Sequence, residues 1–433
     1  MSRRRALLGV AAVLAAVVIV SVVTLTVTLY DGAGSGGGGD GVDNRRRFDT
    51  YTNSIASVAA RADAAAATVD AGIVLDEDDT KAHRAPRLTL SGTTDTIFVS
   101  VASFRDNECG PMLLDMYHRA EKPRRVFAGV VEQHAPGDPP CLQAGWIAEH
   151  RETDKDCQLQ DFCPSDNVRV RRIDPKHSRG PTFGRYVAML MWRGERYFLM
   201  LDSHNRFILH WDTVITTMHA ELSARHPRPV VLSHYPEGYS NESNFNFDRE
   251  STSYLCKAKY LDWGVLRFDG IVIPTPKQPL QQPYAAAGFL FAEASMVHNV
   301  PFDPHLDYLF DGEEVLYSAR MWTHGYDIFS PTRNVVFHFY GRHGAPKVWD
   351  THKQWSETQA KTKERVQYLL EVTRQGTEHA VLGIHPKEGH ILRHADKYGM
   401  GSVRTLDEWY RFAGINKIDR RFDKDWCATA QQH

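Results

Sequence analysis

The residues with the clearest chemical meaning are Asp202 and His204, which directly follow an apolar run that starts at Tyr197. Such a run, with aromatic members, is typical of a strand buried on both faces of a sheet. In extended backbone, side chains two positions apart point the same way, so a carboxylate oxygen and an imidazole nitrogen can bind one cation. The pattern therefore predicts a divalent metal site at a strand end, of the kind that a diphosphate requires.

The same Asp-x-His pattern also begins at Asp303 and at Asp350. The first of these copies lies between prolines in an expected loop, and the second lies in a polar stretch that enters a charged helix. Neither copy follows a buried strand, so we expect no metal site at either. For Asp202 and His204, the alternative interpretation is an ordinary turn at the end of a strand.

Three carboxylates, Asp311, Glu313 and Glu314, surround a glycine just before an expected helix. They could contact a sugar, but acidic residues at a helix N-terminus are also favourable capping groups. Further on, a short apolar strand ends in His338, which could complete the metal site. A single histidine at a strand end is more often structural, so the residues alone leave both interpretations open.

Strands and helices alternate from residue 96 onward. The expected strands are 96–102, 126–131, 168–172, the run that ends at Asp202, 230–233 and 335–338, and the expected helices begin at Pro111, Pro181 and Trp211 and include the charged segment 361–374. This alternation predicts a parallel, right-handed α/β sheet with its site at the carboxyl ends of the strands. No G-x-G-x-x-G follows the first strand and no P-loop occurs, so a metal, and not a glycine-rich turn, is expected to hold the nucleotide.

The first 30 residues have a different composition. Arg3, Arg4 and Arg5 precede the uncharged stretch 6–30, which as a helix of about 1.5 Å per residue exceeds the ~30 Å hydrocarbon core of a bilayer. We interpret 1–5 as a cytosolic tail, 6–30 as a transmembrane signal anchor and not a cleaved signal peptide, and 31–95 as a Gly- and Ala-rich stem. Because basic flanks stay in the cytosol, we expect a single-pass type II protein with its catalytic head in the Golgi lumen.

The overall charge and the cysteines limit the possible partners and compartment. A formal net charge of −2 over 433 residues offers no basic surface for nucleic acid. All six cysteines lie on the side expected to be lumenal, where disulfides persist. Cys157 and Cys163 are close enough in sequence to pair, although some cysteines could equally be free thiols. Asn241 begins a glycosylation acceptor sequence, which would be used only in a lumenal head.

Several separated motifs, in order, resemble one known family. They are the segments 97–111 and 302–309, Asp202-Ser203-His204, Asp311-Gly312-Glu313-Glu314 and Trp322-Thr323-His324-Gly325. Over about residues 96–414 the chain resembles the hydroxyproline and polypeptide α-N-acetylglucosaminyltransferases, glycosyltransferase family 60. The resemblance implies a GT-A type nucleotide-sugar-binding sheet, a retaining mechanism, UDP-GlcNAc as donor and Mn²⁺ or another divalent cation. Cytosolic members lack an anchor, so this chain is more similar to the secretory branch.

A more distant similarity, to the mucin-type polypeptide GalNAc transferases, implies roles for further residues. The motifs of those enzymes occur in the same order here, as Asp202 and His204, Gly312-Glu313, Arg320-Met321-Trp322 and His338. This order implies that His338 is the third metal ligand, that Arg185 lies near the nucleotide together with Asp202, and that Ser103 and Arg105 lie near the uridine. The carboxylates of Asp311, Glu313 and Glu314 are then the catalytic candidates, expected to orient sugar hydroxyls more than to form a covalent intermediate.

The expected function is therefore metal-dependent transfer of GlcNAc from UDP-GlcNAc to a Thr, Ser or hydroxyproline hydroxyl of a secretory-pathway polypeptide. We expect a catalytic domain at 96–343 and a helical and irregular C-terminal extension at 344–433 packed on it. Alternative hypotheses are an inactive lumenal lectin or scaffold of the same fold, a transferase that uses another UDP-sugar, and a metal hydrolase. Release of UDP with a metal present would distinguish an active transferase from an inactive lectin or scaffold, and a metal hydrolase should lack tight UDP binding.

Overall fold

The computed structural model describes residues 95–142, 167–240, 249–342, 344–372 and 389–430. The expected cytosolic tail, signal anchor and stem all lie outside these residues, as do Cys157, Cys163 and Asn241. Within the described ranges, no helix has both the length and the apolar character needed to cross a bilayer. The anchor at 6–30 therefore stays a prediction.

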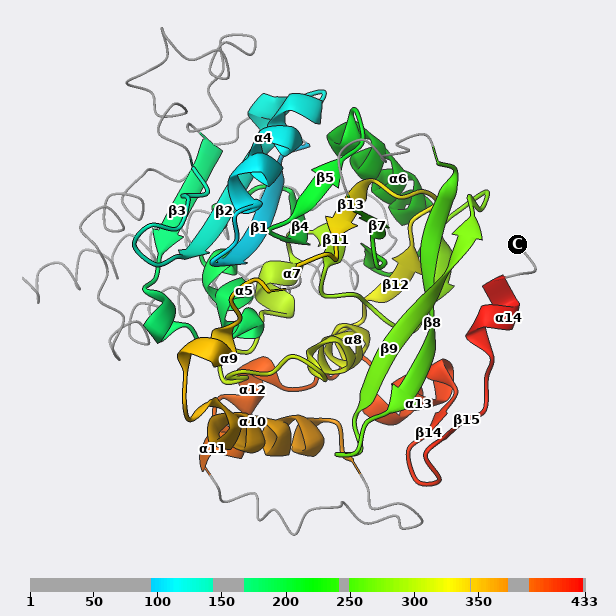
Figure 1. The fold of residues 1–433 in the computed structure, drawn as a ribbon. Coiled ribbons are helices and arrows are strands. Elements are labelled where there is room, and N and C mark those ends of the chain that lie inside the picture. The colour runs from blue at the N-terminus through cyan, green and yellow to red at the C-terminus, as the bar shows by residue number, and fades with distance from the viewer. Residues whose placement is uncertain (1–94, 143–166, 241–248, 343, 373–388, 431–433) are drawn as a thin grey trace, which may run out of the picture. The chain divides into compact units, whose positions relative to one another are not determined.

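An eight-stranded mixed sheet forms the centre of the described chain, in the order β10-β12-β6-β11-β4-β1-β2-β3 (Figure 1). Its strands are β1 Ile97–Phe104, β2 Val126–Gln133, β3 Val168–Arg172, β4 Tyr197–Asp202, β6 Val230–Ser233, β10 Leu280–Gln282, β11 Phe289–Glu293 and β12 Asp327–Ser330. Strands β1 to β4 run parallel, as the sequence predicts, and so do β6 and β12. The α/β class is thus confirmed.

The expectation of a wholly parallel sheet is wrong at two strands. Strand β11 runs antiparallel to both of its neighbours, β4 and β6, and β10 runs antiparallel to β12. A parallel pair needs a crossover connection that is usually helical, whereas the chain between β6 and β11 contains short strands and a long hairpin but no described helix. Because β11 is reversed, it starts at the edge where β1, β4 and β6 end, and it brings Ala287 and Gly288 there.

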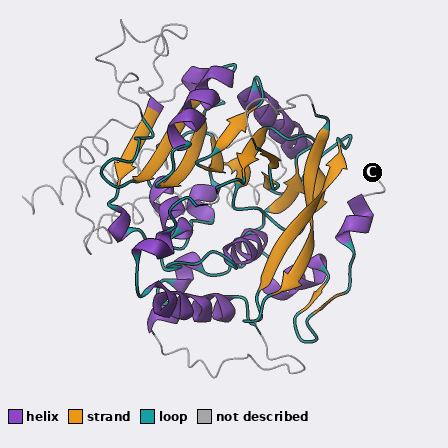
Figure 2. Ribbon diagram, in the orientation of Figure 1, coloured by secondary structure: helices purple, strands orange, loops and turns teal. Residues whose placement is uncertain are grey.

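Helices cover both faces of the sheet (Figure 2). Alternate residues of β1 point to opposite faces: Val99 and Val101 pack with α4 Cys109–Arg119 and α6 Trp211–Arg225, whereas Phe98 packs with α5 Pro181–Met189, α7 Met296–Asn299 and α8 Glu313–Thr323. Two separate apolar cores result, which accounts for the nearly continuous burial of β1, β2 and β4. The edge of the sheet at which β1 and β4 end is therefore supported by closely packed cores on both faces.

A small three-stranded sheet follows the end of β4. Its strands are β5 Asn205–Phe207, β7 Glu237–Tyr239 and β13 Val336–Phe339. Strand β13 pairs antiparallel with β5, so that His338 lies opposite Asn205, next to His204. This register brings together residues that are more than 130 positions apart in the sequence.

The remaining elements lie outside the central sheet and the three-stranded sheet. They are the hairpin of β8 Ser251–Tyr260 and β9 Leu266–Pro274, the 3-10 helices Pro123–Arg125 and Pro175–His177, the helices α9 Val348–Thr351, α10 Trp355–Leu369, α11 Gly389–Leu392, α12 Ala395–Tyr398, α13 Leu406–Ala413 and α14 Trp426–Ala430, and the short strands β14 Ile415–Asn416 and β15 Arg421–Phe422. A disulfide joins Cys256 on β8 to Cys427 on α14, and apolar residues of α10 and α13 share a core with α8 and β9. The boundary at 343/344 stays a prediction.

Candidate active site

A cavity of about 1350 Å³ opens at the carboxyl edge of the central sheet. Residues from the ends of β1 and β4, the segment before β11, the start of α8, the strand β9 and the segment after β13 all line it. Small-molecule sites usually occupy ~300–1,000 Å³, so this cavity has room for a small molecule and part of a second reactant.

The three predicted metal ligands meet at this edge. Asp202, His204 and His338 each offer one ligand atom, and these atoms lie within 4.8 Å of one another. Asp202 Oδ2 and His338 Nε2 are 3.1 Å apart, and the ring centroids of the two histidines are 4.5 Å apart. The structure thus brings His338 beside the Asp-x-His pair.

The chemistry of this cluster fits a divalent transition metal. One carboxylate oxygen and two imidazole nitrogens form a mixed donor set of the kind that such ions accept. Burial would raise the pKa of Asp202, but the hydrogen bond from His338 and the charge of Arg185 outweigh it and hold this pKa well below its usual range. The carboxylate is therefore ionised, as a metal ligand must be. The buried Nδ1 of His338 has no hydrogen-bond partner among the described residues, so no second bond competes for this ring.

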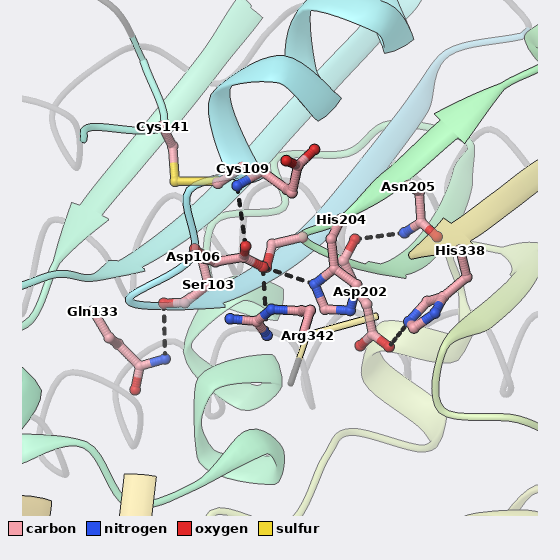
Figure 3. Close-up of polar contacts among 12 residues, drawn as sticks. Ser103, Asp106, Cys109, Gln133, Cys141, Asp202, His204, Asn205, His338 and Arg342 are labelled. Atoms are coloured by element: carbon pink, nitrogen blue, oxygen red, sulfur yellow. Dashed lines mark hydrogen bonds and ion pairs between the residues drawn. A yellow bond between two sulfur atoms is a disulfide. The ribbon is translucent and has the colours of Figure 1, made fainter. Parts of the chain in front are cut away.

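Asp106, which the sequence did not single out, orients His204 (Figure 3). Its Oδ2 accepts hydrogen bonds from His204 Nδ1 at 2.7 Å and from Ser203 Oγ at 2.5 Å, and Arg342 Nη1 lies 3.6 Å away. A proton held on Nδ1 leaves Nε2 of the same ring as the free ligand atom. The Cys109–Cys141 disulfide joins the start of α4, just after Asp106, to the segment that follows β2.

Other possible metal sites among the described residues are explained by other bonds. A second group, Glu132, His134 and Cys141, includes a sulfur already used in the disulfide to Cys109. Asp303 forms a buried ion pair with Arg365 at 2.7 Å. Asp350 accepts a bond from the backbone of Lys347 at the start of α9. Neither of the two other Asp-x-His copies joins a metal cluster, as their sequence context predicts.

Arg185 connects the metal cluster to the acidic start of α8. Its guanidinium contacts Asp202 Oδ1 at 3.1 Å and Glu313 Oε1 at 2.6 Å, while Glu313 Oε2 accepts a bond from Thr182 at 2.7 Å. Burial opposes the charge of Arg185, but the two carboxylates outweigh it and raise the pKa of the guanidinium. Because Glu313 is ion-paired with the buried Arg185, this carboxylate positions the guanidinium and is poorly placed to act as a nucleophile.

Glu314 lines the cavity together with Glu313 and Asp311 but has different hydrogen-bond partners. It accepts hydrogen bonds from the Tyr235 hydroxyl at 2.5 Å and from the backbone N–H of Ala287 at 2.8 Å. Burial raises the pKa of Glu314 to about 7, although the bonds from Tyr235 and Ala287 oppose that rise. Asp311 lies further out, with its side chain 39% exposed and 3.6 Å from Arg267. The three carboxylates therefore have different surroundings and are suited to different tasks.

A glycine makes this arrangement of the acidic segment possible. Gly312 has φ of 102°, and a Cβ at this position would lie 2.8 Å from the ring of Trp263. Only glycine accepts that backbone conformation and that contact together. Helix α8 then begins with Glu313 and Glu314, whose charges are favourable at a helix N-terminus.

Two residues expected near the uridine lie beside the cavity and not on its wall. The Ser103 hydroxyl is within 3.0 Å of His134 Nε2, and Arg105 pairs with Asp138 at 2.8 Å. The cavity is lined instead by Ala102 and Phe104 of the same strand. A role of Ser103 and Arg105 in nucleotide binding stays a prediction.

A family model described as "Glycosyltransferase (GlcNAc)" matches residues 96–419, which is most of the chain and includes every residue of the site. No curated protein matches this sequence.

Two solved structures are similar in fold at low identity. GalNAc-T7, solved with UDP, GalNAc and Mn²⁺, is 13% identical with a TM-score of 0.46, and the match covers 74% of this chain and 56% of that one. Residues 1–349 of S. aureus TarS are 12% identical with a TM-score of 0.35, covering 63% of this chain and 69% of that one. The present chain thus spans just over half the length of GalNAc-T7, and likenesses this weak leave its own donor and acceptor open.

Proposed function

This chain belongs to the family of GlcNAc glycosyltransferases, and from that membership we propose that it moves GlcNAc from UDP-GlcNAc to a hydroxyl group of a polypeptide with the help of Mn²⁺ or a similar ion. The observation that carries the proposal is the convergence of Asp202, His204 and His338 on a cavity that also contains Glu314. Family membership agrees with the resemblance to GlcNAc transferases found in the motifs.

The sheet supports a GT-A type arrangement for the donor. Parallel strands β3, β2, β1 and β4 end at one edge, and no glycine-rich phosphate loop follows the first of them in sequence. Such an edge is where α/β proteins bind nucleotides, and without a phosphate loop the diphosphate needs another source of positive charge. The cluster of Asp202, His204 and His338 is where a cation would supply it.

Breaking the bond between the sugar and UDP creates negative charge on the leaving diphosphate. A divalent ion bound here would act as a Lewis acid that stabilises this charge. Asp202, His204 and His338 would hold the ion, Asp106 would orient His204, and Arg185 would keep Asp202 in place while adding its own positive charge nearby. The protein thus provides a fixed electrostatic environment for charge development.

Retention of configuration requires either attack by a carboxylate or entry of the acceptor on the face that UDP leaves. Both carboxylates line the cavity and accept two hydrogen bonds, but Glu313 is ion-paired with the charged Arg185, whereas the donors to Glu314 are neutral, the Tyr235 hydroxyl and the backbone N–H of Ala287. We therefore assign Glu314 to orienting the sugar hydroxyls, and Asp311 to the rim where the acceptor enters. This assignment favours entry of the acceptor on the same face over a covalent intermediate.

Transfer to a polypeptide gives a defined product. We expect the full chain, supplied with UDP-GlcNAc and Mn²⁺, to glycosylate a Thr-rich or a hydroxyproline-containing peptide with an α-linkage. The measurement is NMR of the glycopeptide, in which the coupling of the anomeric proton distinguishes α from β. A β-linked product would contradict retention, and transfer only to free sugars would contradict a polypeptide acceptor.

The site of action that we propose is the Golgi lumen, with residues 6–30 as a type II anchor. The arginine-flanked apolar stretch supports this proposal, as do the disulfides Cys109–Cys141 and Cys256–Cys427, because disulfides persist in the secretory pathway. Protease treatment of sealed vesicles tests it: digestion of the head without detergent would contradict this topology.

A further inference from the structure

The cavity extends well beyond the metal cluster and along one strand. Residues 266–272 of β9 line it without a gap, together with residues 257–259 of β8. Successive side chains of a strand point to opposite faces, so an unbroken run of lining residues means that the cavity runs past the edge of β9 as well as one face. The backbone N–H and C=O groups along this edge are therefore part of the site.

The hydrogen bonds that flank the hairpin show which backbone groups point outward. Thr275 N donates to Glu250 O at 3.2 Å at one end, and Leu261 N donates to Val265 O at 2.8 Å at the other. Bonded and non-bonded pairs alternate along an antiparallel ladder. Counting from either end, the N–H and C=O of Gly270 and Val272 turn away from β8.

Two further bonds agree with this count. Leu255, which pairs with Gly270, turns its N–H away from β9 and donates to Gln282 Oε1 at 2.9 Å. Gly270 N donates to Asp269 Oδ1 at 2.8 Å and not to β8. The backbone N–H groups of Leu255 and Gly270 therefore point to the two opposite outer edges of the hairpin, as the alternation requires.

The outer edge of β9 has no partner strand among the described residues, where β9 pairs with β8 alone. Val272 is 54% exposed, and no described group bonds to its backbone N–H. A strand edge with free donors and acceptors recruits an extended chain, and such edges are otherwise usually covered or blocked. Pro274 blocks only the last outward position of this edge, which is otherwise uncovered at Val272 and opens into the cavity that contains the metal cluster.

We propose that an extended segment of the acceptor polypeptide binds as a third strand along the free edge of β9 and so delivers its hydroxyl group to Glu314 and the donor sugar. The proposal rests on the proposed function, because it needs a polypeptide acceptor. It assigns recognition mainly to backbone hydrogen bonds at the N–H and C=O of Val272 and at the C=O of Gly270, whose N–H is bonded to Asp269. The occupant is an acceptor chain because the edge and the candidate catalytic groups share one cavity.

Val272→Pro tests the proposal on the enzyme. Proline removes the outward N–H without removing a bond to β8, and Pro274 already occupies the next outward position of this strand. We expect kcat/KM for a Thr-rich peptide to fall about three- to tenfold, the effect of one net hydrogen bond, while UDP affinity and UDP-GlcNAc hydrolysis stay unchanged. The control, Val272→Thr, keeps the N–H and a similar shape and should behave as the wild type.

N-methylation of the same peptide, one residue at a time, tests the proposal without changing the protein. Strand addition predicts losses at alternate residues only, because every second N–H faces β9. Losses at every position, losses at none, or full peptide transfer by Val272→Pro would each overturn the proposal. If the wild type hydrolyses UDP-GlcNAc but transfers to no peptide, the polypeptide acceptor itself is wrong, and that outcome is distinct from a failure at the β9 edge.

Discussion

Replacing Asp202 or His204 by alanine should reduce metal-dependent turnover by about 100-fold or more, because each substitution removes a ligand of the ion that stabilises the leaving diphosphate. The fold should survive, since Asp202 is the last residue of β4, His204 follows it, and both residues lie outside the two apolar cores. Mn²⁺ binding by isothermal titration calorimetry and UDP release should be lost together, while the melting temperature changes little.

The matched control is Asp350→Asn. Asp350 belongs to a second Asp-x-His, and asparagine keeps the oxygen that accepts from the backbone of Lys347. We expect its activity to stay within about twofold of the wild type, as for most surface substitutions. Asp303 is not a suitable control, because its loss would leave the buried charge of Arg365 unpaired. Full activity of Asp202→Ala in the presence of chelator would contradict the metal site.

Glu314→Gln should lower kcat/KM for transfer by about 100-fold while UDP affinity stays within about threefold, because the lost charge acts on the sugar and not on the nucleotide. Glutamine keeps an oxygen that can accept from Tyr235 or Ala287, so the local structure should persist. Glu293→Gln, an exposed carboxylate at the far end of β11, is the matched control and should be neutral. An equal loss of UDP affinity would show that Glu314 acts elsewhere.

The raised pKa of Glu314 gives this prediction a second readout. Burial raises the pKa to about 7, against the influence of Tyr235, Ala287 and Arg185 and with that of Glu313. If the ionised form orients the sugar, kcat/KM rises with pH through about 7, and Glu314→Gln removes that rise. The folded state keeps a proton that the unfolded chain loses above 4.5, so the contribution of Glu314 to the free energy of unfolding falls as pH rises toward 7.

Local sequence signals predicted the elements that rest on one strong pattern. The change from apolar to polar at Asp202 located the end of β4, and β3, β6 and α6 have the expected bounds because turn residues or prolines mark their ends. Long-range pairing is different. The ligand role of His338 was ambiguous from the residues alone, since it depends on the register of β13 against β5, which local spacing does not contain.

Three other features could not be predicted from local sequence patterns. A register shift between Leu255 and Lys257 disturbs the period of two in β8, so this strand lacks the alternation that reveals a strand. Asp106 looked like an ordinary loop residue because its partners, Ser203 and His204, lie almost 100 positions away. The reversal of β11 also had no local signal, since strand direction depends on the connection and not on composition.

Metal-dependent GlcNAc transfer is best tested by the release of UDP from a panel of UDP-sugars by the purified full chain, with Mn²⁺ and then with chelator. We expect more release from UDP-GlcNAc than from UDP-GalNAc, UDP-galactose or UDP-glucose, loss of release with chelator, and recovery when Mn²⁺ is restored. Tight binding of UDP without release from any sugar would indicate an inactive lectin or scaffold of the same fold. Release that persists in chelator, or preference for another sugar, would contradict a metal-dependent GlcNAc transferase.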